Sequence, residues 1–143
     1  MARTCLGTPY HHTGRVPGVA LDCAGLVIHV MRALRLMPLD FDVLGYAQAP
    51  DGQMRARCDE HLVPIARAAM QPGDAVLLIT DMEPQHLGIL GTYRSGVLSI
   101  IHATNARSVV PARVIETRLM FSRSLRFVAA YALPGVEGSG WDS

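Results

Sequence analysis

The fold of this chain depends on one stretch, which reads Leu21-Asp22-Cys23-Ala24-Gly25-Leu26-Val27-Ile28-His29-Val30-Met31. Apolar residues recur here and just beyond with the spacing of one buried helical face. The residues of that face are Leu26, Val27, Val30 and Leu34. The pattern predicts a helix from Cys23 to about Leu36, which ends ahead of Pro38 because the residue before a proline disfavours helical backbone. Asp22 has a side chain that suits the N-cap position of this helix.

The predicted helix places Cys23 in its first turn, a position that suits a nucleophile. The thiolate is the reactive form of cysteine, and the N–H groups and positive dipole end of a helix start stabilise it. The same N–H groups can donate to the oxyanion that forms when a thiolate attacks a carbonyl group. The alternative is that Cys23 is one more small apolar residue of the core, which is the commoner role of a cysteine.

Composition indicates a single globular domain. The chain has 143 residues, of which 50% are hydrophobic and 17% charged, so it is long enough to bury a proper core. The net charge is +1, without a basic block or a basic face interleaved with aromatic residues. The sequence therefore offers no support for a nucleic-acid partner. Nor is any apolar run long enough to span a membrane, so we expect no membrane insertion.

The three cysteines, Cys5, Cys23 and Cys58, are an odd number at wide and unmatched spacings. They form neither a CxxC pair for zinc nor a disulfide framework, which fits a reducing compartment. The first residues lack the apolar core of a signal peptide. We expect a protein made in the cytoplasm without a signal peptide, which another component must carry if it acts outside.

The first half of the chain predicts loops and helices. Residues 7–20 are rich in Gly, Pro and His and indicate an ordered loop that leads to Cys23. After the first helix, residues 38–50 form a connector. Residues 51–62 suggest a second and more polar helix, in which Cys58 is structural or free, and residues 64–70 a short helical or irregular link.

The second half predicts strands that follow one another as an antiparallel meander. These strands cover residues 75–79, 86–93, 97–103, 109–115 and 126–133, and Asp74 is expected to fix the turn ahead of the first of them. Helices followed by such a meander give an α+β fold, not an alternating βαβ one. We therefore expect one domain over residues 1–134, and a flexible Gly- and Ser-rich tail over residues 135–143.

Two histidines are placed to meet Cys23. His86 begins one predicted strand and His102 ends the next, so a hairpin in simple register would make them cross-strand neighbours. Thiol catalysis needs a base that takes and returns a proton, and a polar group that fixes the tautomer of that base. Cys23, His86 and His102 would satisfy this need. A solvated role for each histidine, or a metal half-site formed with Cys23, is the alternative, although no further ligand is placed to complete tetrahedral coordination.

Several motifs occur in a particular order, and together they resemble the NlpC-type cell-wall cysteine peptidases, a papain-like family that acts on bacterial peptidoglycan. The resemblance is greatest to the short branch found in phage tails and gene transfer agents, and it extends from Gly7 to about Pro134. The motifs are Gly7-Thr8-Pro9-Tyr10, Leu21-Asp22-Cys23-Ala24-Gly25-Leu26-Val27, Pro72-Gly73-Asp74, His86-Leu87-Gly88-Ile89, Ile101-His102-Ala103 and Arg126-Phe127-Val128-Ala129-Ala130-Tyr131.

The resemblance implies a role for each matching residue. Cys23 matches the family's nucleophile, His86 its general base and His102 the polar third member of the triad. Tyr10 matches a tyrosine whose hydroxyl helps to hold the substrate or the oxyanion, although it can equally be a packing residue. Asp22 matches an acidic residue that holds a substrate amine, although the role of helix cap alone would explain it.

The family's fold has N-terminal helices packed on a central antiparallel sheet of about five strands. Its activity implies hydrolysis of a stem-peptide bond, between D-glutamate and a diamino acid, without metal or cofactor. The partners implied are peptidoglycan and the proteins of a phage-like tail tip. Two departures are Ala24, where many members have serine, and the very short segment before Gly7.

Three rivals remain open on the sequence alone. The chain can be a structural tail-tip subunit with little or no activity. It can be a thiol amidase or acyltransferase, because a nucleophile and a base do not specify the acceptor. A metal-binding module that uses Cys23, His86 and His102 is the third.

Overall fold

The structure is a computed structural model that describes residues 1–38, 42, 53–80, 85–105 and 109–134. It contains the helices α1 (Cys23–Ala33) and α2 (Gln53–His61) and the 3-10 turns η1 (Ala2–Cys5) and η2 (Arg67–Ala69). The strands are β1 (Arg15–Val16), β2 (Ala20–Leu21), β3 (Val63–Ile65), β4 (Ala75–Thr80), β5 (His86–Thr92), β6 (Leu98–Thr104), β7 (Arg113–Arg118) and β8 (Leu125–Ala132). This architecture confirms the α+β class.

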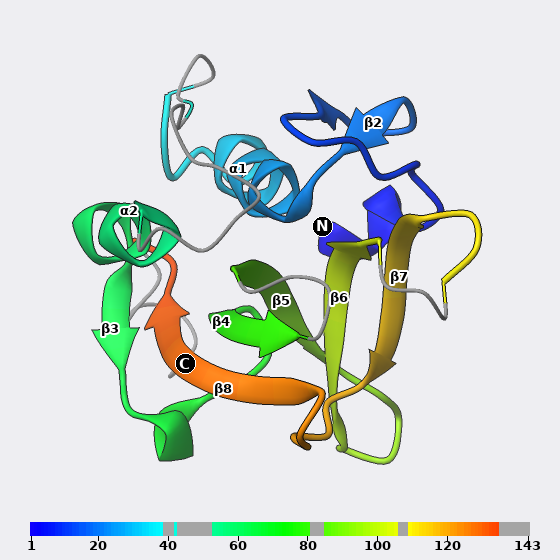
Figure 1. Ribbon diagram of the computed structural model, residues 1–143. Coiled ribbons are helices and arrows are strands. Elements are labelled where there is room, and N and C mark those ends of the chain that lie inside the picture. Colours follow the sequence, from blue (N-terminus) through cyan, green and yellow to red (C-terminus); the bar gives the residue numbers. More distant parts are fainter. Residues whose placement is uncertain (39–41, 43–52, 81–84, 106–108, 135–143) are drawn as a thin grey trace.

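One antiparallel sheet organises the fold. Its six strands follow the order β3-β8-β4-β5-β6-β7, and β1 and β2 form a separate two-stranded ladder. The sheet is strongly curved, and both helices lie above its concave side (Figure 1). Helix α1 packs most extensively against β5 and also contacts β6 and β1, so it lies over the strands that carry His86 and His102.

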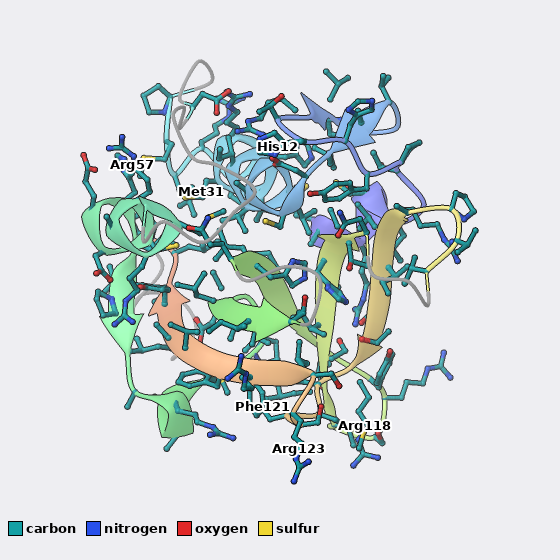
Figure 2. All side chains as sticks on the ribbon, in the orientation of Figure 1. His12, Met31, Arg57, Arg118, Phe121 and Arg123 are labelled. Carbon is teal, nitrogen blue, oxygen red and sulfur yellow. The ribbon has the colours of Figure 1, made fainter. Side chains whose placement is uncertain are left out.

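Apolar side chains fill both faces of the sheet. On the side of α1 the core contains Leu26 and Val27 of the helix together with Ile89 and Ile101 of the sheet. The other face carries a smaller cluster made of Val76, Leu78, Leu90 and Ile100. Phe121 and Phe127 cover this second cluster, and the guanidinium of Arg67 lies 4.4 Å from the Phe121 ring centroid. Phe121 lies on the far side of β8 from α1 (Figure 2).

Helix α1 is buried on nearly all sides, whereas the sequence predicted that only one face of it would be buried. Eight of its 11 residues are buried, including Cys23 and Ile28. The helix ends at Ala33, before the predicted Leu36, because Arg35 adopts a left-handed backbone conformation with φ +58°. Leu34 is therefore a C-cap residue that is 44% exposed, and its expected burial was wrong.

Helix α2 falls inside the predicted range of residues 51–62, and a partly buried hydrogen bond connects it to the sheet. The hydroxyl of Tyr131 in β8 donates to Asp59 Oδ1 at 2.7 Å. Burial and this bond raise the pKa of Tyr131. Cys58 on the same helix is a buried free thiol, as predicted.

Four of the five predicted strands are present to within a residue at each end, namely β4, β5, β6 and β8. The strand predicted at residues 109–115 was misplaced, since β7 begins at Arg113. Pro111 lacks the N–H group that a strand interior needs. The count of about five strands was too low for the sheet, which has six. The prediction missed β3 because Pro64 interrupts a run of three residues, and an edge strand paired only with β8 tolerates that proline.

The segment predicted as a loop, residues 7–20, contains the short strand β1 and the first residue of β2. The prediction for Asp74 is confirmed, because its Oδ2 accepts a hydrogen bond of 2.9 Å from the Gln71 N–H group. Most of the connector at residues 38–50, and the tail at residues 135–143, lie outside the described residues. No helix in the described ranges is long and apolar enough to cross a membrane.

Candidate active site

Cys23 is the first residue of α1, as the sequence predicts. It is buried, with 6% of its surface exposed, and its Sγ lies 4.0 Å from the carbonyl oxygen of Gln85. Gln85 immediately precedes His86, the first residue of β5. The nucleophile candidate and the start of the strand that carries the base candidate are therefore adjacent.

Asp22 caps the helix, which confirms the N-cap prediction. Its Oδ1 accepts a hydrogen bond of 2.7 Å from the Gly25 N–H group, and its Oδ2 accepts one of 2.8 Å from the Thr13 N–H group. The Leu26 N–H group bonds the Asp22 carbonyl at 3.1 Å. Asp22 thus accepts hydrogen bonds from the N–H groups of Gly25 and Leu26. The N–H groups of this turn that could still donate to an oxyanion are those of the first two residues of the helix. Binding of a substrate amine by Asp22 stays a prediction.

His86 and His102 meet as the sequence predicts. His86 Nε2 lies 2.6 Å from His102 Nδ1, and the two rings are arranged edge to face with their centroids 4.8 Å apart. The ladder pairs Ile89 with Ile101, and in a continuation of this register His102 would lie opposite Gly88. The two histidines are then diagonal neighbours, two residues out of direct register. Both are buried, with exposed fractions of 0% and 8%.

The short contact between the rings constrains their protonation. A single proton lies between His86 Nε2 and His102 Nδ1, because two N–H groups cannot face each other at 2.6 Å. The pair therefore carries at most one positive charge while the bond is formed. When His86 is the protonated ring, its Nε2–H donates to Nδ1 of a neutral His102, and its own Nδ1–H remains for a proton transfer.

Gln85 is a site residue that the sequence analysis missed. Its side-chain Oε1 accepts a hydrogen bond of 3.1 Å from the Met54 N–H group in the first turn of α2, while its backbone carbonyl faces Cys23. One residue thus connects α2, the nucleophile candidate and the start of β5. A lone glutamine in a loop carries no motif, so no signal in the sequence could have identified it.

Backbone contacts fix the approach motif that carries Tyr10. The N–H group of Gly7 donates to the Val114 carbonyl in β7, and that of Tyr10 to the Ala112 carbonyl just before this strand. Tyr10 also forms a bridge with Leu21. Tyr10 is partly buried and packs against the core cluster that includes Cys23. The structure therefore brings Tyr10 to the same region as the start of α1, although its contact with a substrate stays a prediction.

Two glycines allow the approach loop to lie directly against the first turn of α1. A Cβ atom added at Gly25 would collide with the carbonyl oxygen of Gly14 and would lie 3.1 Å from Asp22 Oδ1. A Cβ at Gly14 would lie 2.7 Å from backbone atoms of Ala20 and Leu21. The glycine after the cysteine in this motif is thus required by close packing of two backbones.

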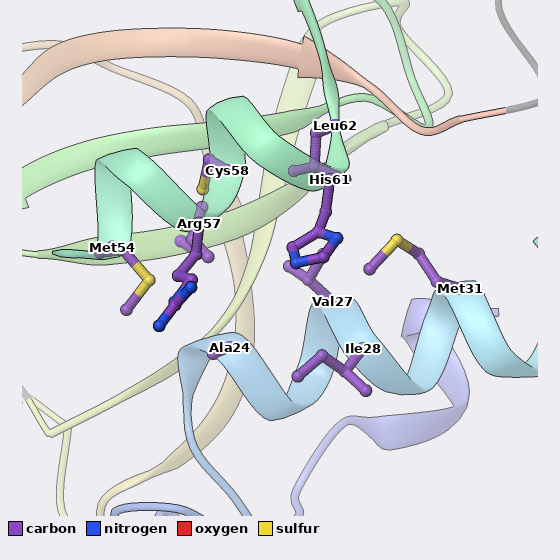
Figure 3. A pocket seen from close by; sticks show the side chains of 10 residues that line it. Ala24, Val27, Ile28, Met31, Met54, Arg57, Cys58, His61 and Leu62 are labelled. Carbon is purple, nitrogen blue, oxygen red and sulfur yellow. The ribbon is translucent and has the colours of Figure 1, made fainter. Parts of the chain in front are cut away.

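A small apolar pocket lies between α1 and α2, next to the candidate site (Figure 3). It has a volume of about 40 Å³ and includes Ala24 and Leu87, the residues that follow Cys23 and His86. The guanidinium of Arg57 and the ring of His61 also line it.

No group of three or more His, Cys, Asp or Glu side chains could hold a metal ion within the described part of the chain. Neither a protein-family model nor a curated protein matches the sequence.

The three thiols are expected to differ in reactivity. Burial raises the pKa of Cys5, and burial together with the Asp59 charge raises the pKa of Cys58 to about 12, so both are protonated near neutral pH. Cys23 begins a helix, which favours its thiolate. With iodoacetamide at pH 7, peptide mapping should show Cys23 alkylated about 10-fold faster than the other two thiols. Labelling of Cys23 no faster than a free model thiol would count heavily against its assignment as nucleophile.

Proposed function

We propose that this chain is a cysteine peptidase that hydrolyses a peptide bond in the stem of bacterial peptidoglycan, with Cys23, His86 and His102 as its triad. The observation that supports this most is the buried His86–His102 pair, whose nitrogens are 2.6 Å apart. His86 immediately follows Gln85, the residue whose backbone carbonyl group faces Cys23 Sγ. A base whose second ring nitrogen is held by a polar partner, together with a thiol at a helix start, is the arrangement that thiol acyl transfer needs.

The proposed reaction has two steps. His86 takes the thiol proton, the Cys23 sulfur attacks the scissile carbonyl, and N–H groups at the start of α1 hold the oxyanion. The peptide C–N bond breaks as the His86 imidazolium gives its proton to the leaving amine. Water, deprotonated by His86, then attacks the thioester, which restores the thiol and releases the carboxylic acid.

We further propose the papain-like NlpC-type fold and a place in a phage-like tail tip, where the enzyme would assist penetration of the cell wall. Helix α1, which carries the cysteine at its start, and the antiparallel sheet, which carries both histidines, support this fold. The tail location and the bond between D-glutamate and a diamino acid depend on the resemblance of the ordered motifs.

One observation favours a second candidate, a structural tail-tip subunit with little activity. Cys23 and His86 are 6% and 0% exposed, so a substrate has little access to them in this conformation. The presence of all three triad candidates favours the enzyme, because a purely structural subunit has no need for a thiol at a helix start and a buried, paired histidine.

Mass spectrometry of stem peptides tests the proposal. Purified stem peptides of known diamino-acid type are incubated with the wild-type protein and with the Cys23→Ala variant. A new pair of fragments from the wild type alone would support the peptidase, and the two masses would identify the bond. Failure to cleave any stem-peptide type, by the free protein and by its assembled complex, would favour the structural subunit.

A further inference from the structure

We infer that Arg15 is a positioning residue for the nucleophile, because its guanidinium compensates the buried carboxylate of Asp22 and so preserves the ability of Cys23 to ionise. This inference deepens the proposed function, since it rests on Cys23 as the nucleophile. It can nevertheless be tested on the thiol itself, without a peptide substrate.

The contacts of Arg15 are extensive for a residue of a two-residue strand. Its Nη1 donates to Asp22 Oδ1 at 2.9 Å and to the Gly14 carbonyl at 2.9 Å, and its Nε donates to Asp42 Oδ1 at 2.9 Å. The Arg15 side chain is 14% exposed and that of Asp22 only 2%. The β1–β2 ladder pairs Arg15 with Leu21, which holds the guanidinium beside the residue before the nucleophile.

The carboxylate of Asp22 is fixed within the first turn of α1, because its Oδ1 also accepts the Gly25 N–H group. Cys23 belongs to the same turn. A buried negative charge so close to a thiol opposes formation of the thiolate, because like charges repel strongly where water is excluded. The guanidinium of Arg15 offsets that charge and leaves the dipole of the helix start to act on Cys23.

Other charged or titratable groups also surround this turn. On the side of the approach loop, His12 Nδ1 lies 3.9 Å from Asp22 Oδ2, and Arg32 lies 3.6 Å from Asp42. On the side of the sheet lie His86 and His102. On the side of α2, the pocket that Ala24 lines is also lined by Arg57, Cys58 and His61. Arg15 donates a hydrogen bond of 2.9 Å to the capping carboxylate, from a side chain that is only 14% exposed. The effect of Arg15 should therefore depend on the charge of Asp22.

The test is the pH dependence of Cys23 alkylation by iodoacetamide, measured by peptide mapping in folded protein. Arg15→Met is expected to raise the midpoint of Cys23 ionisation by about one pH unit. Asp22→Asn keeps an oxygen for the helix cap but removes the buried negative charge that opposes the thiolate, while Arg15 stays in place beside Asp42. This variant is therefore expected to lower the midpoint. In the Asp22→Asn background, Arg15→Met should no longer raise the midpoint above that of the wild type.

Arg3→Met is the matched control, since Arg3 also forms a guanidinium–carboxylate pair, with Glu116 at 2.9 Å, but it has no bond to Asp22. It should leave the midpoint unchanged. An unchanged midpoint in folded Arg15→Met would overturn the inference. If Arg15→Met fails to fold, the Asp22→Asn variant provides the test. A midpoint of Cys23 ionisation in Asp22→Asn that equals the wild-type midpoint would also overturn the inference. Each of these outcomes is independent of whether any stem peptide is cleaved.

Discussion

Replacement of Cys23 by alanine is expected to lower the rate of stem-peptide hydrolysis at least 10³-fold, to the background of the assay. The proposed pathway forms a thioester on this sulfur, and alanine offers no atom that could replace it, so both steps are lost together (roughly 10³-fold or more). The measurement is the initial rate of fragment release, followed by chromatography and mass spectrometry. Because Cys23 is buried and begins α1, unfolding by heat should be measured in parallel.

Cys58→Ala is the matched control for this experiment. Cys58 is also a buried free thiol, but burial and the neighbouring Asp59 raise its pKa to about 12, so it has no role as a nucleophile at neutral pH. We expect this variant to lose some stability through the small cavity that it creates, and to keep its rate per folded molecule. A Cys23→Ala protein that cleaves at the wild-type rate would contradict the peptidase proposal outright.

The histidine pair permits a graded version of the same prediction. His86→Ala removes the base itself and is expected to lower the rate by about 10³-fold. His102→Ala leaves the base but removes the acceptor that lies 2.6 Å from His86 Nε2, so the loss should be smaller, about 10²-fold. A larger loss at His102 than at His86 would require the two roles to be exchanged.

Much of the fold could be predicted because its signals are local. Asp22 before an apolar helical run, and the alternation of turn residues with apolar stretches after Gln71, predicted α1 and four of the strands. Elements set by tertiary contacts could not be predicted. Val63–Ile65 becomes a strand because β8 offers it a partner, and α1 stops at Ala33 because Arg35 turns the chain. Neither event is encoded in hydrophobic periodicity.

The candidate site shows the same division. Spacing was sufficient to predict that His86 and His102 meet across a hairpin, but not their register, since they are diagonal neighbours instead of a direct pair. The involvement of Gln85 depends on the start of α2, and that of Arg15 on the β1–β2 ladder that brings its guanidinium to Asp22. Polar residues of this kind act through bonds that the fold supplies, and single-sequence patterns give no information about them.

Gly25→Ala is expected to cause the largest loss of stability among the single substitutions considered for this site. The added methyl group would collide with the Gly14 carbonyl oxygen and crowd both Asp22 Oδ1 and Arg15 Nη1, at 3.1 and 3.2 Å. These atoms belong to a backbone and to a buried ion pair, so they cannot rotate away as the end of a free side chain would. We expect a cost of about 3 kcal/mol, even though alanine favours a helix over glycine by about 1 kcal/mol.

Thermal unfolding by circular dichroism measures this effect, and the melting temperature should fall by roughly 6–10 °C. Gly96→Ala is the control, because its methyl group would enter open space and only the φ of +80° opposes it, for a cost of about 1 kcal/mol. Since the collision separates the approach loop from α1, folded Gly25→Ala protein should also lose the Asp22 cap and alkylate at Cys23 more slowly. A melting temperature equal to that of the wild type would mean that the loop and the first turn of α1 are not in direct contact, and the arrangement of Asp22, Arg15 and Cys23 would then need revision.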